Sequence, residues 1–228
     1  MSGPAVIAAM LSLTAGAVQA QGTFAPPAGC EGVLTIQHRS CLMTNVWQCD
    51  GDAPDEKWVA LFTQAGPFSI RKVDGDFQWL ETYYADPPAV ERMDLPAADP
   101  SSVDELLATG LDSYDFVTRR DDGTAPERIV GFDRLTGETV TIDGEPLLAT
   151  EFGYETRLPD GSVVYAGGGA QFLSERHRLF ILGLSWSSDD PRDVTDMSPV
   201  EFLNPGDDGF FASEPAVDCD VVMSEYVR

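Results

Sequence analysis

Alternating apolar and polar side chains mark the clearest element of the sequence, residues 148–158. Every second position from 148 onward is Leu, Thr, Phe or Tyr, whereas Glu151, Glu155 and Arg157 lie between them. This period of two is typical of a β-strand with one dry and one wet face, because side chains alternate across extended backbone. A helix would spread those glutamates over the apolar stripe. The segment is therefore predicted to be a strand.

The same alternation, often weaker, predicts further strands on both sides of it. In residues 178–187, Phe180, Leu182, Leu184 and Trp186 are expected to share one face. Leu179 and Ile181 make the other face apolar as well, so this strand is expected to be buried on both sides. The remaining predicted strands are residues 32–39, 46–49, 58–63, 68–73, 77–83, 114–118, 138–142, 162–166 and 170–174.

Asp-Gly pairs separate many of these segments and predict tight turns. Glycine accepts the positive φ of such turns and aspartate tolerates the neighbouring position. The pairs begin at Asp50, Asp74, Asp122, Asp143, Asp160 and Asp208. The spacing favours an antiparallel meander, and the predicted fold is mainly β, a curved sheet or incomplete barrel.

One short helix is predicted at residues 102–109, within this sheet protein. Ser102 and Glu105 have the spacing of a capping box, and Gly110 lies where a helix ends. Two proline-rich stretches resist assignment. Residues 85–100 are expected to connect two parts of the sheet, and residues 188–228 to form an irregular C-terminal tail.

The N-terminal residues 1–20 differ from the rest of the chain. Residues 5–18 are uncharged and mostly apolar, and Val18-Gln19-Ala20 supplies small residues for a cleavage site. This run is shorter than the roughly 20 residues that span a bilayer and is typical of a signal peptide. We therefore expect residues 21–228 to form a single β-rich domain that is periplasmic or secreted.

Four cysteines fit an oxidising compartment: Cys30, Cys41, Cys49 and Cys219. Three disulfide pairings are possible. Cys41 and Cys49 flank Thr44-Asn45, which is interpreted as a hairpin tip. We therefore expect a Cys41–Cys49 bond, with Cys30 and Cys219 joining the two ends of the domain. A zinc site and a lipid-modified Cys30 remain weaker alternatives.

The charge balance excludes some partners. Asp and Glu number 38 against 14 Lys and Arg, a net charge of −24. Such a surface repels nucleic-acid phosphates and anionic membrane surfaces. The excess acid fits solubility in a salty medium, a cationic partner or bound calcium.

Candidate chemistry is sparse. Serine catalysis needs a histidine base, and only His38 and His177 are available. Any two of the many carboxylates would suit a hydrolase, so no catalytic residue is assigned. No cofactor is expected, because the glycine triplet at 167–169 lacks the lysine of a phosphate loop and fits a strand bulge.

Two acidic clusters are weak calcium candidates, since calcium prefers carboxylate oxygens. The first contains Asp50 and Asp52, followed by Asp55 and Glu56, and the second contains Asp189, Asp190 and Asp193, followed by Asp196. Neither follows the calcium loop of helical proteins, because Pro54 occupies a ligand position of that pattern. The alternative is a water-exposed turn.

Residues 129–183 resemble uncharacterised exported proteins of marine proteobacteria, on their Asp-Gly hairpins and the closing segment Arg178-Leu179-Phe180-Ile181-Leu182-Gly183. The meander with one short helix is also similar to the half-barrels of periplasmic lipoprotein carriers. This resemblance implies a curved sheet and transfers no site residue.

The leading expectation is an exported binding or envelope-accessory protein rather than an enzyme. Its apolar face would shelter a hydrophobic small molecule, and an envelope protein is the other expected partner. The candidate ligand-binding residues are Phe152, Tyr154, Phe180, Leu182 and Trp186. Core packing by the same side chains is the simpler alternative. The rival functions are a carboxylate-dependent hydrolase of a cell-envelope polymer and a calcium-stabilised structural protein.

Overall fold

The computed structural model describes residues 22–219. They form one antiparallel sheet of 13 strands and a single short helix, which confirms the predicted mainly β meander with one short helix. The expected signal peptide, residues 1–20, lies outside the described residues. The elements are β1 (Cys30–His38), β2 (Leu42–Cys49), β3 (Lys57–Thr63), β4 (Gly66–Val73), β5 (Trp79–Ala85), β6 (Pro88–Met93), α1 (Val103–Thr109), β7 (Leu111–Arg120), β8 (Glu127–Ile142), β9 (Glu145–Arg157), β10 (Val163–Ser174), β11 (Leu179–Ser187), β12 (Asp190–Asp196) and β13 (Pro199–Leu203).

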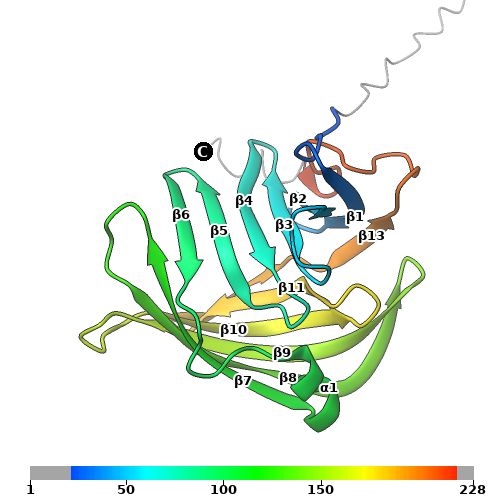
Figure 1. Cartoon of the computed structure of the whole chain (residues 1–228). Coiled ribbons are helices and arrows are strands. Elements are labelled where there is room, and N and C mark those ends of the chain that lie inside the picture. Colours follow the sequence, from blue (N-terminus) through cyan, green and yellow to red (C-terminus); the bar gives the residue numbers. More distant parts are fainter. Residues whose placement is uncertain (1–21, 220–228) are drawn as a thin grey trace, which may run out of the picture.

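The sheet is a strongly curved meander that does not close into a barrel. Each strand from β1 to β12 pairs with the next, and β13 returns to pair with β1. Figure 1 shows β7 to β11 as one wall, with β2 to β6 rising steeply from it. Two hydrogen bonds tie the link between β12 and β13 to both walls, Met197 N to Gly183 O at 2.9 Å and Arg39 N to Ser198 O at 3.0 Å.

Local sequence accounts for the turns and the helix. Asp143 and Gly144 both have positive φ, 49° and 82°, in the tight turn between β8 and β9. Ser102 caps α1 by accepting a hydrogen bond from Glu105 N at 3.2 Å, and Gly110 ends it in a left-handed conformation. The predicted helix and its caps are confirmed. Because the helix is so short, its stability depends on packing against the sheet.

Two apolar clusters bring the walls together. The larger joins Leu34 and Ile36 of β1 to Leu147, Leu179 and Ile181 of the opposite wall. The second packs α1 on the sheet through Val103, Leu106 and Leu173, with Phe77 and Phe180 against them. Phe77 takes part in both clusters, so the loop that precedes β5 connects the helix to the core between the walls.

The two proline-rich stretches contain strands that the sequence did not predict. Residues 85–100 include β6, whose prolines lie at its start and in the loop that follows. An irregular structure from residue 188 onward is wrong, because β12 and β13 occupy most of residues 190–203. The two predicted strands at 162–166 and 170–174 are one strand, β10, that passes through the glycine triplet.

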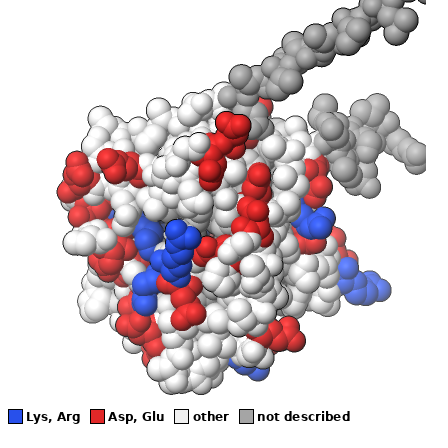
Figure 2. Space-filling view, turned by 90° about the vertical axis from the view of Figure 1, so that its right-hand side faces the viewer, with Lys and Arg blue, Asp and Glu red and all other residues white. Residues whose placement is uncertain are grey.

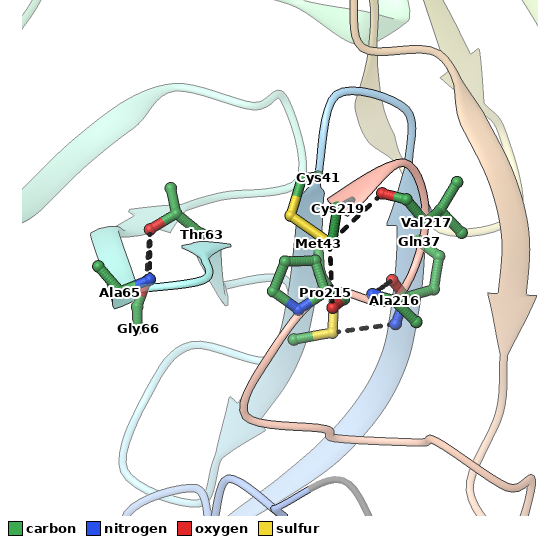
Figure 3. Close-up of a disulfide and its surroundings, with 10 residues drawn as sticks. All are labelled: Gln37, Cys41, Met43, Thr63, Ala65, Gly66, Pro215, Ala216, Val217 and Cys219. Carbon is green, nitrogen blue, oxygen red and sulfur yellow. Dashed lines mark hydrogen bonds between the residues drawn. A yellow bond between two sulfur atoms is a disulfide. The ribbon is translucent and has the colours of Figure 1, made fainter. Parts of the chain in front are cut away.

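The expected disulfide pairing is wrong. Cys30 bonds to Cys49, and Cys41 bonds to Cys219, as Figure 3 shows for the second bond. The error lies in the hairpin tip, because β1 and β2 turn at residues 39–41 and Thr44-Asn45 lies within β2. Cys30 and Cys49 are therefore direct cross-strand partners. Two disulfides are compatible with an oxidising compartment.

Candidate functional site

A pocket of about 410 Å³ lies between the two walls of the curved sheet. This volume falls within the roughly 300–1,000 Å³ that is usual for small-molecule sites. Aliphatic side chains line it together with aromatic ones from both walls, among them Phe68, Trp79, Tyr84, Phe116, Phe152 and Tyr154. The pocket can therefore accept an apolar group and surround it with rings.

Four of the five expected ligand-binding residues line this pocket: Phe152, Tyr154, Phe180 and Leu182. Tyr154 is central among the rings. Its centroid lies 5.2 Å from that of Tyr165 and 6.3 Å from that of Trp79 on the opposite wall. The alternation along β9 thus brings two predicted residues onto the pocket side of the strand.

Trp186 is separated from the other four by a β-bulge. The register of β10 and β11 shifts between Ala170 and Phe172, and Ser185 lies opposite Gly169. A bulge adds one residue to a strand and therefore reverses the alternation beyond it. Ser185 lines the pocket in consequence, whereas Trp186 does not. The expected common face of Phe180, Leu182, Leu184 and Trp186 is wrong past the bulge.

The glycine triplet makes room for the rings of the pocket. A Cβ atom at Gly169 would lie 2.5 Å from the Phe152 ring and 2.0 Å from the Leu184 carbonyl oxygen. One at Gly167 would lie 2.4 Å from the Tyr165 hydroxyl. Both aromatic side chains therefore lie directly against the backbone of β10, next to the bulge, where a larger residue would displace them.

Asp133 is the acidic side chain in the lining of the pocket. Its Oδ1 accepts a hydrogen bond from Gln171 Nε2 at 2.7 Å. Burial raises the pKa of Asp133 to about 7, with a further contribution from the charge of Asp112. The carboxyl group is therefore protonated over a wide range of acidic pH and can then donate as well as accept.

Asp112 lies opposite Asp133 in the pairing of β7 with β8. Its Oδ2 accepts from Ser102 N at 3.0 Å, and burial raises its pKa to about 6. Its Oδ1 has no hydrogen-bond partner among residues 22–219. Asp112 is only 3% exposed and does not line the pocket, so the two acids do not flank one open groove.

The two histidines occupy structural positions. His38 lies at the pocket, with Nε2 2.9 Å from Thr44 Oγ1 and Nδ1 3.0 Å from the Met197 carbonyl oxygen. Burial lowers the pKa of His38 to about 4, so the ring is neutral near pH 7. His177 Nε2 lies 3.7 Å from Glu145 Oε1, and burial lowers its pKa too.

The two acidic clusters do not form metal sites. Asp52 accepts hydrogen bonds from Trp58 Nε1 at 2.8 Å and Lys72 Nζ at 2.7 Å, so its oxygens already have protein partners. Asp190 and Asp193 belong to β12, every residue of which is exposed. In the described part of the chain, no three His, Cys, Asp or Glu side chains are arranged to hold a metal ion.

Sequence reasoning missed the half of the pocket that the N-terminal wall contributes. Phe68, Arg71, Trp79 and Tyr84 come from β4 and β5, two strands that were predicted without any site residue. Phe116, on β7 of the other wall, was also missed, although it lay in a predicted strand whose alternation could have assigned it to the apolar face. Which strands face one another across a curved sheet depends on the curvature, and alternation does not report curvature.

The protein carries a net charge of −24. Figure 2 shows acidic side chains spread over one face, with basic side chains in a few groups beside them. No helix within residues 22–219 has the length and apolar character needed to cross a membrane. No protein-family model, curated protein or solved structure matches this chain.

Proposed function

We propose that the protein is an exported, non-enzymatic binding protein that shelters a hydrophobic small molecule between the walls of its curved sheet. The observation that carries this proposal is the pocket of about 410 Å³ with aromatic side chains on both walls. Burying apolar surface there contributes roughly 25 cal/mol per Å². The disulfides and the expected signal peptide support export.

A hydrolase acting through two carboxylates has less support. Retaining and inverting glycosidases place both acids beside the substrate, with roughly 5 to 10 Å between them. Only Asp133 of the Asp112–Asp133 pair lines the pocket. A calcium-stabilised protein has no arrangement of ligands among residues 22–219 to support it.

Native mass spectrometry of protein purified from its own cell envelope tests the proposal. The expected result is a mass that exceeds that of the mature chain by one small apolar molecule, released by organic solvent. The neutral fluorophore N-phenyl-1-naphthylamine should also bind the stripped protein saturably. A bare mass together with no saturable fluorescence would overturn the proposal.

Two matched variants locate the binding. Phe68 lines the pocket and is 54% exposed, and Leu111 is 49% exposed and does not line it. Both positions should tolerate glutamate, because neither side chain is buried. We expect F68E to weaken binding of the fluorophore about tenfold, the loss of roughly one apolar contact, and L111E to leave it unchanged.

A further inference from the structure

Arg71 on β4 carries a guanidinium group along the pocket wall. Its carbon Cζ lies 3.9 Å from the centre of the Trp79 ring, and its Nε donates to Thr82 Oγ1 at 3.0 Å. Thr82 is fully buried in the neighbouring strand. These two contacts hold the guanidinium in one orientation, because the planar group stacks on the ring while one nitrogen is fixed.

Arg71 differs from the other arginines in its partners. Within residues 22–219 it is the one arginine without a carboxylate oxygen in ion-pair contact, that is, within 4.0 Å. The arginines that have such a partner are Arg39, Arg92, Arg119, Arg120, Arg128, Arg134, Arg157, Arg176, Arg178 and Arg192. The protein has 38 acidic residues, and yet Arg71, the arginine beside the pocket, has none of the described ones as an ion-pair partner.

The groups nearest Arg71 leave its positive charge without a direct ion-pair partner. Tyr84 and Tyr154 line the pocket near it, and burial raises the pKa of both phenols, that of Tyr154 to about 12. Both phenols are therefore neutral near pH 7 and place no negative charge beside Arg71. Glu91, the acid whose charge Arg71 influences, lies more than 4.0 Å from the guanidinium nitrogens, and its Oε1 accepts a hydrogen bond from the Tyr84 hydroxyl at 3.4 Å.

We propose that Arg71 binds the carboxylate of a long-chain carboxylic acid whose hydrocarbon chain occupies the aromatic pocket. This inference rests on the proposed function and names the chemistry of the ligand. A guanidinium meets a carboxylate with two parallel hydrogen bonds, and such charge-assisted bonds are strong where water is scarce. The apolar chain would contact the rings while the head group completes the missing ion pair of Arg71.

Three probes with the same alkyl chain test the assignment: dodecanoate, dodecanol and dodecylammonium, titrated calorimetrically into the stripped full-length protein at pH 6, where Asp133 is mainly protonated. We expect dodecanoate to bind at least tenfold more tightly than dodecanol, and dodecylammonium to bind no more tightly than dodecanol. Equal affinity for dodecanoate and dodecanol would overturn the role of Arg71. Tightest binding of dodecylammonium would do the same and would assign the head group to Asp133.

Matched arginine variants add a second measurement. R71Q should remove the preference for dodecanoate and leave dodecanol affinity within about twofold, because only the head-group contact is lost. Arg134 also lies over an aromatic ring, that of Phe132 at 5.1 Å, but pairs with Glu151 and does not line the pocket. R134Q should therefore keep the full preference. An R71Q protein that still prefers dodecanoate would overturn the assignment.

The same titrations separate the two proposals. Binding of dodecanol without any preference for dodecanoate would leave the hydrophobic binding function standing and refute the carboxylate site. Failure of all three probes to bind the wild-type protein would refute both. The wild-type comparison needs no variant, so it stands even if R71Q does not fold.

Discussion

At the scale of single residues, Asp133 combines an acidic group with an apolar environment. Its side chain is buried in the wall of the pocket and receives one hydrogen bond, from Gln171. Desolvation favours the neutral form of a carboxyl group, which explains its pKa of about 7 against an ordinary 3.8. Between pH 4 and 7 the native protein therefore keeps a proton on Asp133 that the unfolded chain has already released.

This difference predicts how the stability of an Asp133→Asn variant compares with that of the wild type. Because the native state holds the extra proton, the Asp133 contribution to the free energy of unfolding falls as pH rises from 4 to 7. The slope is at most about 1.4 kcal/mol per pH unit for one proton. Asparagine cannot ionise, so the variant should gain on the wild type steadily across this interval, as measured by urea denaturation.

The exposed Asp189→Asn substitution is the matched control, expected to change stability by less than about 0.5 kcal/mol at every pH. A constant difference between D133N and wild type from pH 4 to 8 would contradict the shifted pKa. Titration of the Asp133 carboxyl carbon by NMR gives the same quantity directly.

At the scale of elements, the glycines of β10 shape the pocket, because the absence of a Cβ atom lets aromatic rings pack against the strand. We expect Gly169→Ala to cost about 1–3 kcal/mol, because its Cβ would overlap the Leu184 carbonyl oxygen and the Phe152 ring. Binding of N-phenyl-1-naphthylamine should weaken as well, since the ring would be pushed into the pocket. Denaturation curves and fluorescence titration measure the two effects.

Gly51→Ala provides the comparison, because a Cβ at Gly51 meets no atom within 4 Å. This substitution should leave stability within about 0.5 kcal/mol of wild type. If G169A were equally neutral, the close packing of Phe152 on β10 would be disproved.

Alternation predicted most strands of the sheet, but prolines, charged stretches and a β-bulge led to errors. The strand at 148–158 and the capped helix could be predicted because each carries its own local signal. The strands β6, β12 and β13 were missed because prolines surround β6, β12 has one apolar residue besides its proline, Val194, and β13 is only five residues long. The bulge in β11 includes Gly183, but a glycine within a strand does not by itself show that the alternation reverses there, so the side of Trp186 was predicted wrongly.

At the scale of the whole molecule, the disulfides join segments that the sequence order separates. Cys41–Cys219 connects residues 178 positions apart, and Cys30–Cys49 residues 19 apart. Neither pairing follows from spacing alone, since the first depends on where the chain returns after β13 and the second on the register of β1 and β2. Placing the β1–β2 turn at Thr44-Asn45 instead of residues 39–41 therefore led to the wrong partner for every cysteine.

Removing either bond should lower stability, and the loss should grow with the logarithm of the length of the loop that the bond closes. In the loop-entropy description, C41S/C219S should lose about 5 kcal/mol and C30S/C49S about 3 kcal/mol. Urea denaturation of the two double variants under non-reducing conditions measures the losses. Peptide mapping without reduction checks the connectivity, and a fragment joining Cys41 to Cys49 would contradict it.

One outer margin of the sheet is formed by β12, which has backbone groups on one side without a partner strand. Its seven residues include Asp190, Pro191, Arg192, Asp193 and Asp196. Charged side chains and proline on an outermost strand discourage a second molecule from extending the sheet. The aspartates of β12 that suggested calcium ligands therefore discourage edge-to-edge pairing of two sheets along this strand.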